Sequence, residues 1–351
     1  MTQPNRPVVS AVRDLGIQFL DNPLDITGHD CASSIPLPGG QSFWIFGDTM
    51  EGPFETIRNH PLDEVISGTG AIVPIQDLSH GVREFRHLAT PDGTRPRQLL
   101  GWIPPEHKST QRLWAVHGTY VNGHLYMYYH KVTLDPVLDV FEAFTLDGMG
   151  LARGDDTYHF ERLKAPDGTY ELWKGNQPGF GAWVQPHDGW LYLWGCIQPE
   201  SKSAGEEYLA RVRPDDIEDV RAYEYLVEAP TLADPTVKPR WSGTFARTAM
   251  LFDHVPNELS SSYNEYLGAF ISLTTYERED RLVIRTAPEI TGPWSEPEVF
   301  HRPPRAKPDS LFNAGKEHPA FAREGGRIIY MTYIDSSVYV PHLLEITLDR
   351  P

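Results

Sequence analysis

The sequence predicts an all-β protein, a single five-bladed β-propeller over residues 1–351 in which the two ends of the chain share one blade. The 351 residues include 31 prolines and 29 glycines spread along the chain, which favours short strands joined by many turns. A hairpin with a glycine-containing turn and an aromatic-rich second strand recurs five times. The fifth hairpin lacks an outer strand, which residues 7–15 would supply.

The five hairpins follow one another at intervals that suit four-stranded blades of about 70 residues. Asn-Gly and Asp-Gly between apolar runs are the strongest short-range hairpin signals. The predicted turns are Gly39-Gly40, Asn122-Gly123, Asp188-Gly189, the region of Gly268, and Gly325-Gly326. The fifth inner strand is expected at GKEHPAF. A β-sandwich with several hairpins, or two all-β domains, is the alternative fold.

Charge and composition narrow the classes of partner. The net charge of −17 argues against nucleic acid and anionic membranes and is compatible with a neutral carbohydrate substrate. No stretch approaches the roughly 20 apolar residues of a membrane span. The first residues, MTQPNRPVVS, lack a leader pattern, so we expect a cytoplasmic protein or an exported one whose leader has been removed. The two cysteines, Cys31 and Cys196, are expected to be small buried residues.

Two aspartates on the first hairpin are the candidate catalytic residues. A three-residue turn over Pro38–Gly40 would set Asp30 opposite Asp48, with Cβ atoms about 4.5 to 5.5 Å apart; a two-residue turn would send them to opposite faces. In a propeller both would reach one rim of the central funnel. Carboxyl groups about 5 to 5.5 Å apart suit a retaining glycosidase, with one nucleophile and one acid/base. Roles in turn capping or in a structural calcium site are the alternatives.

The first hairpin also resembles a known family. GQSFWIFGDT, with Asp30 upstream, is similar to the first hairpin of the DUF4185-type five-bladed propellers. SSSYNEYLGAF, TAPEITGPWSEP and EHPAFAREGGRIIYMTY resemble the fourth and fifth blades of that family. Some members are glycoside hydrolases that cut D-arabinan internally. The resemblance implies that Asp30 and Asp48 are the catalytic pair and that the substrate is a furanosidic or related oligo- or polysaccharide.

Six further residues are candidates for substrate binding. His130 ends the second hairpin as Asp48 ends the first, and aromatic rings near inner strands can stack on sugars or pack between blades. Glu317 and His318 would begin the fifth inner strand, where they would bind sugar hydroxyls, form a salt bridge or serve the structure. The candidates are His130, Trp183, Arg247, Tyr263, Glu317 and His318.

Two other functions stay open beside the glycoside hydrolase. A non-catalytic carbohydrate-binding propeller would have the two aspartates far apart or bound by backbone donors. A glycoside phosphorylase would need a phosphate cradle, for which Arg247, Lys131 and Lys316 are the candidates. No cofactor is expected, and the histidines of the second hairpin lack the spacing of a zinc site.

Overall fold

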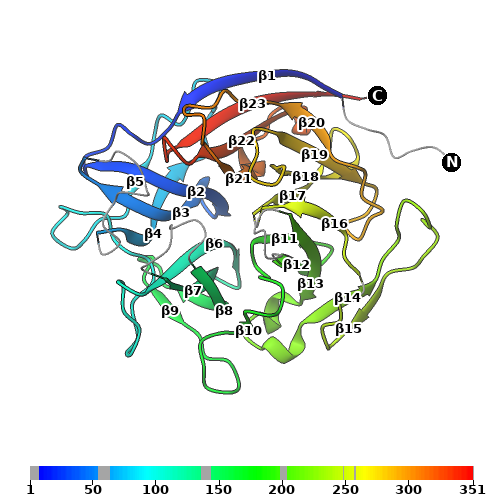
Figure 1. Ribbon diagram of the computed structural model, residues 1–351, viewed down its shortest axis with the longest axis horizontal. Coiled ribbons are helices and arrows are strands. Elements are labelled where there is room, and N and C mark those ends of the chain that lie inside the picture. The colour runs from blue at the N-terminus through cyan, green and yellow to red at the C-terminus, as the bar shows by residue number, and fades with distance from the viewer. Residues whose placement is uncertain are drawn as a thin grey trace.

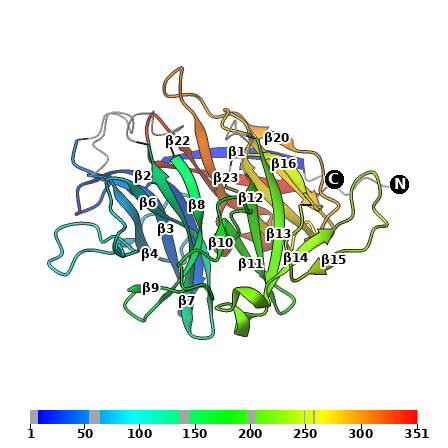
Figure 2. The same ribbon diagram turned by 60° about the horizontal axis from the view of Figure 1, so that its bottom comes forward.

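A computed structural model describes residues 8–53, 64–135, 144–197, 204–247, 249–256 and 258–350. Five antiparallel sheets surround a central axis (Figure 1), which confirms the predicted five-bladed β-propeller. Figure 2, turned toward the side of the ring, shows the strands running from one face of the ring to the other. Within the described ranges, no helix has the length and apolarity needed to cross a membrane.

The blades follow the chain order. Blade 1 is β2 (Ile26–Leu37), β3 (Gln41–Glu51), β4 (Ile66–Pro74) and β5 (Arg86–His87). Blade 2 is β6 (Gln111–Val121), β7 (His124–Leu134) and β8 (Phe144–Gly154), flanked by β9 (Phe160–Arg162) and β10 (Trp173–Lys174). Blade 3 is β11 (Trp183–His187), β12 (Trp190–Ile197), β13 (Gly205–Val212), β14 (Glu224–Glu228), β15 (Arg240–Ser242) and β16 (Phe252–Val255).

The last two blades complete the ring. Blade 4 is β17 (Ser260–Asn264), β18 (Ala269–Thr275), β19 (Leu282–Ala287) and β20 (Glu298–His301). Blade 5 is β21 (Phe312–Glu317), β22 (Ile328–Asp335), β23 (Pro341–Asp349) and β1 (Val8–Ile17). Short 3₁₀ turns occur at Pro214–Asp216, Val220–Ala222, Pro319–Phe321 and Glu324–Gly326. The strands nearest the axis are β2, β6, β11, β17 and β21, and each contacts its two neighbours around the ring.

The ring closes as the sequence predicts, through the two ends of the chain. β1 pairs antiparallel with β23 from Val8 opposite Asp349 to Ile17 opposite His342. The two terminal strands therefore lie side by side at the outer edge of blade 5, blue beside red in Figure 1. This pairing covers an edge of β23 that would otherwise present unpaired backbone groups to solvent.

The predicted boundary of the fifth hairpin is wrong. The inner strand β21 comprises residues 312–317, so Glu317 ends it and His318 follows it. The prediction expected both residues at its start. The cause is the connection to β22, which is not a tight turn at the glycines but a longer segment holding the two 3₁₀ turns Pro319–Phe321 and Glu324–Gly326.

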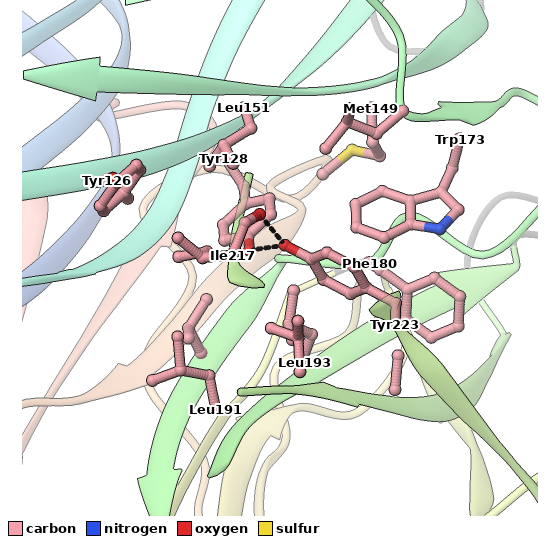
Figure 3. Close-up of a cluster of buried hydrophobic side chains, with 14 of the residues drawn as sticks. Tyr126, Tyr128, Met149, Leu151, Trp173, Phe180, Leu191, Leu193, Ile217 and Tyr223 are labelled. Carbon is pink, nitrogen blue, oxygen red and sulfur yellow. Dashed lines mark hydrogen bonds between the residues drawn. The ribbon is translucent and has the colours of Figure 1, made fainter. Parts of the chain in front are cut away.

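The large clusters of buried hydrophobic residues in the described ranges each combine side chains from adjacent blades. Figure 3 shows the cluster between blades 2 and 3, where rings and aliphatic side chains from both sheets interdigitate. Two phenols inside it are hydrogen-bonded: the hydroxyl groups of Tyr128 and Tyr223 are 2.7 Å apart, and Tyr223 donates to the carbonyl of Ile217 at 2.6 Å. Buried Tyr hydroxyls normally find such partners because an unpaired polar group inside a core is costly.

Candidate functional site

A pocket opens at the centre of the ring, and its described lining residues come from blades 1, 2, 4 and 5 and from the connection between blades 3 and 4. About 850 Å³ of empty space lies in the pocket and at its mouth, and part of this space is open solvent. We call this pocket the central pocket. Its described lining residues are Asp30, Cys31, Gly47, Asp48, Trp114, Ala115, Val116, His130, Phe144, Pro256, Glu258, Arg278, Leu311, Asn313, Ala314 and Tyr339. Both candidate catalytic aspartates therefore border one cavity.

The first hairpin brings the two aspartates to the pocket by an irregular route. Its turn has the three-residue form, because Leu37 pairs with Gln41. The further prediction that Asp30 is the direct partner of Asp48 is wrong. The ladder between β2 and β3 is interrupted by register shifts on both sides of Cys31, and Asp30 falls within the irregular stretch. Asp48 remains regularly paired with Ser67 of β4 on its other side.

Local backbone geometry explains the interruption. Cys31 and Ala32 have φ angles of 65° and 115°, values that residues with a Cβ rarely adopt. Bulges of this kind twist a strand and re-aim its side chains. Gly47 faces the bulge, and a Cβ at this position would lie 3.3 Å from the Cβ of Asp30. The glycine of the FGDT sequence thus leaves room for the side chain of Asp30.

Hydrogen bonds from three described residues hold Asp30. Its Oδ1 accepts from the backbone N–H of Cys31 at 2.7 Å and from Nδ2 of Asn313 at 3.0 Å. The hydroxyl of Tyr339 donates to Oδ2 at 3.2 Å. Burial, followed by the negative charge of Glu258, nevertheless raises the pKa of Asp30 to about 6. A carboxyl group with this pKa can gain or lose a proton close to neutral pH, as a catalytic acid or base must.

Asp48 has a different environment. Its Oδ1 accepts from the indole Nε1 of Trp114 at 2.9 Å and lies 3.7 Å from Nε of the buried Arg112. Burial raises the pKa of Asp48, while Arg112 and the bond from Trp114 act in the opposite direction. Asp48 in turn is one of the charges that raise the pKa of Asp30, so the two carboxyl groups are electrostatically coupled.

A third carboxylate, Glu258, borders the same pocket. Its Oε2 lies 2.5 Å from Nζ of Lys316, which is fully buried, and 3.2 Å from Sγ of Cys31. Burial alone would raise the pKa of Glu258, but the ion pair and hydrogen bond with Lys316 outweigh burial and lower it. Glu258 is therefore ionised at neutral pH.

Among the predicted binding residues, the structure brings His130 to the central pocket. Burial lowers the pKa of His130 to about 4, and its Nε2 has no hydrogen-bond partner among the described residues. Trp183 is also near the axis but is buried. Its ring stacks on His117 with centroids 3.8 Å apart, and its Nε1 donates to the carbonyl of Ser261 at 2.6 Å. Trp183 is not among the described residues that line the pocket.

Arg247 and Tyr263 lie away from the pocket. Arg247 pairs with Glu206 at 3.0 Å, and more than half of its side chain is exposed. Tyr263 neighbours the β17–β18 turn, where its ring stacks on His187 with centroids 6.2 Å apart. The pocket residues of the first hairpin lie at the opposite end, far from their turn.

Glu317 and His318 are buried inside the ring and are not among the described lining residues. Glu317 accepts a hydrogen bond from Ser262 at 2.7 Å, and burial raises its pKa to about 7. His318 contacts the hydroxyls of Ser34 and Thr332, each at 2.9 Å. The contacts of Glu317 and His318 therefore fit the structural role, which the sequence analysis gave as one alternative to sugar binding.

Sequence reasoning missed several residues of the site, foremost Glu258, Asn313 and Tyr339. Glu258 precedes the fourth inner strand at the rim position that Asp30 occupies in the first blade, which is the signal that could have identified it. Asn313, near the start of β21, occupies the place that the sequence assigned to Glu317.

The described residues of the site do not form a metal-binding cluster. Across the described ranges, no three His, Cys, Asp or Glu side chains come together as a metal site requires. Both cysteines are free and buried. The three carboxyl groups of the pocket are engaged instead by protein donors: Asn313 for Asp30, Trp114 for Asp48 and Lys316 for Glu258.

Comparison with solved structures shows the same fold in several proteins of low sequence identity. A candidate hydrolase from Bacteroides ovatus matches with a TM-score of 0.64 and 16% identity over 93% of this chain and 87% of its own. Zg3597, a family 117 glycoside hydrolase from Zobellia galactanivorans, matches with a TM-score of 0.51 and 11% identity over 96% and 90%.

A GH43_1 enzyme from Xanthomonas citri, in complex with xylotriose, matches with a TM-score of 0.52 and 13% identity over 92% of this chain and 87% of its own. Curated protein sequences give no match. A family model described as a domain of unknown function, DUF4185, matches residues 18–340, which include all the described residues that line the pocket. The chain therefore belongs to the DUF4185 family.

Proposed function

We propose that this protein is a glycoside hydrolase that cleaves a furanosidic or related oligo- or polysaccharide with Asp30 and Asp48. The observation that carries the proposal is that two carboxyl groups of one hairpin border one open pocket in different electrostatic environments. Glycoside cleavage needs such a pair, one group able to hold a proton and one that is ionised.

The environments favour distinct roles. Asp48, whose ionised form is favoured by the guanidinium of Arg112 and the indole N–H of Trp114, is proposed as the nucleophile. Asp30, with its pKa raised to about 6 by burial and by Glu258, is proposed as the acid/base.

The proposed reaction has two steps. Asp48 forms a bond to the anomeric carbon while the glycosidic bond breaks, and Asp30 gives its proton to the departing oxygen. Asp30 then takes a proton from water, the water oxygen attacks the anomeric carbon, and the bond to Asp48 breaks. The product keeps the anomeric configuration of the substrate.

The walls of the pocket support a sugar ligand. Trp114 borders the pocket, with the ring of Phe144 against it at 4.9 Å between centroids. Such aromatic surfaces pack against the C–H faces of sugars and bury apolar area. Glycoside hydrolases of families 117 and 43 share this fold, and one of them is in complex with xylotriose. This likeness of fold supports the proposal of a carbohydrate substrate by analogy.

The test begins with a screen of D-arabinan, fructan and mannan, with products resolved by chromatography. Asp30→Asn and Asp48→Asn should each lower turnover of the cleaved polymer by several orders of magnitude. With a dinitrophenyl glycoside, whose leaving group needs no proton, Asp30→Asn should retain a burst of phenol release and Asp48→Asn should not. Full activity of both variants on the polymer would refute the proposal, and an inverted product would refute the two-step mechanism.

The phosphorylase alternative finds little support in the positions of its three candidate cations. Arg247 is paired with Glu206, Lys131 with Glu106 and Glu171, and Lys316 with Glu258. None of the three is among the described lining residues. A rate that depends on added phosphate would restore this alternative, and saccharide binding without turnover would favour the non-catalytic propeller.

A further inference from the structure

A fully buried lysine contacts residues of several blades next to the central pocket. Nζ of Lys316, on β21 of blade 5, donates to Oγ of Ser33 at 2.7 Å and to the carbonyl of Val116 at 3.2 Å. It also contacts Sγ of Cys31 at 3.2 Å and Oε2 of Glu258 at 2.5 Å. These partners come from blades 1, 2 and 4, so a single ammonium group joins four blades.

We call the inner wall of the central pocket that contacts Lys316, formed by Cys31, Val116 and Glu258, the floor of the pocket. Cys31, Val116 and Glu258 line the central pocket, whereas Lys316 lies below them with no exposed side-chain surface. Within the described residues, the ion pair with Lys316 and the hydrogen bond from Cys31 both involve Oε2 of Glu258. The side chain is 14% exposed and the residue lines the pocket, so a ligand in the cavity can reach it.

The backbone of Glu258 is anchored as well. Its carbonyl accepts a hydrogen bond from Oγ1 of Thr274 at 2.7 Å, which ties the segment before β17 to β18. A carboxylate whose position is fixed from both ends loses little conformational entropy when a ligand binds. Glu258 is therefore preorganised as a hydrogen-bond acceptor on the floor.

We propose that Glu258, held in place by Lys316, is a specificity-determining residue that accepts hydrogen bonds from hydroxyl groups of the sugar ring at the floor of the central pocket. The proposal rests on the proposed glycoside hydrolase function and identifies the ligand as a polyhydroxylated sugar whose hydroxyls reach below the scissile bond. His130, which also borders the pocket, lies close enough to interact electrostatically with Glu258 and is a second polar group on this floor.

The chemistry favours hydroxyl groups over other ligands. An ionised carboxylate only accepts hydrogen bonds, and hydrogen bonds to a charged acceptor are about twice as strong as neutral ones. A sugar lacking the matching hydroxyl would leave a partly buried charge desolvated without a new partner, which a site of this kind rejects strongly.

Binding is measured in an inactive background so that it is independent of turnover. Arabino-oligosaccharides from D-arabinan are titrated by calorimetry into Asp30→Asn and into the double variant Asp30→Asn/Glu258→Gln. We expect the second substitution to weaken binding at least tenfold. Glu207→Gln in the same background is the control, because Glu207 is a fully buried glutamate that does not line the pocket; the affinity of this variant should change less than twofold.

Kinetics give a second readout that a purely structural role would not move. Glu258→Gln alone should raise KM more than it lowers kcat, and it should move the basic limb of the pH–rate profile to lower pH. The negative charge of Glu258 raises the pKa of Asp30, so removing this charge should lower the pKa of Asp30 and with it the basic limb. The other ionisable groups that act on Glu258 are Lys316, Cys31 and His130. An unmoved basic limb together with an unchanged KM would overturn the proposal.

A variant that removes both charges separates folding from recognition. Glu258→Gln/Lys316→Met eliminates the unpaired ammonium that the single variant leaves behind, and should recover much of its thermal stability. Affinity that stays low in this variant supports the proposal, and affinity that returns overturns it. If wild type cleaves no glycoside but Asp30→Asn binds the saccharide through Glu258, the hydrolase proposal fails while the binding role stands.

Discussion

Asp30→Asn should make the folded protein more stable at neutral pH while it abolishes the proposed activity. The pKa of Asp30 is raised from 3.8 to about 6, so the folded state keeps this proton to a higher pH than the unfolded chain does. Stability contributed by this group therefore falls as the pH rises from about 4 to about 6 and stays low above that. Asparagine carries no charge and can still accept from Cys31 and Asn313.

The size of the effect follows from the shift. Two pKa units correspond to about 3 kcal/mol, an upper value because neighbouring charges readjust. Unfolding entropy of roughly 2.1 cal/mol/K per residue converts this into a rise of about 4 °C in the midpoint of a chain this long. The assay is thermal unfolding of wild type and variant at pH 7.5 and at pH 4, where the difference should shrink toward zero.

An opposite-sign control is available in an exposed loop. Hydrogen bonds from the backbone of His159 and the side chain of Thr157 lower the pKa of Asp155 to about 2, so Asp155→Asn should reduce stability above pH 4. Equal or lower stability of Asp30→Asn at pH 7.5, or a gain that persists unchanged at pH 4, would refute the reasoning about burial at the site.

Three further results are expected. Trp114→Phe removes the N–H that donates to Asp48, and this hydrogen bond acts to lower the pKa of Asp48. The acid limb of the pH–rate profile should therefore move to higher pH, and an unmoved limb would argue against Asp48 as the nucleophile. Gly47→Ala should cut turnover at least tenfold, because its Cβ would lie 3.3 Å from that of Asp30, and full activity would show that the backbone yields. Deleting the strand β1 should lower the thermal midpoint and promote association through the exposed edge of β23, as measured by light scattering, and a monomer of unchanged midpoint would contradict this.

The hairpins of the fold were predictable because a tight turn is a local property. Asn122-Gly123 and Asp188-Gly189 both adopt positive φ angles at the centre of their turns, as this residue pair favours, and each joins the two strands expected around it. The fifth hairpin was misplaced because its connection contains two 3₁₀ turns, which a search for glycine turns does not detect.

The candidate site was predictable in part. The sequence identified Asp30, Asp48 and His130, all of which border the central pocket. Their neighbours were not found, since Asn313 and Glu258 reach the pocket from other blades. Their proximity to Asp30 depends on how five sheets are arranged around an axis, and no local pattern encodes that distance.

The sequence by itself determined most of the strands, their tight glycine turns and a net charge suited to neutral ligands, because these depend on residues close together in the chain or on composition. It also predicted the closure of the ring, because the fifth hairpin lacks an outer strand that the N-terminal segment can supply. Only the tertiary structure decided the bulge that sets Asp30 apart from the ladder, the pKa shifts of the three carboxyl groups and the contacts by which Lys316 joins four blades. Each of these depends on burial and on charges brought together from separate blades, and burial is a property of the assembled ring.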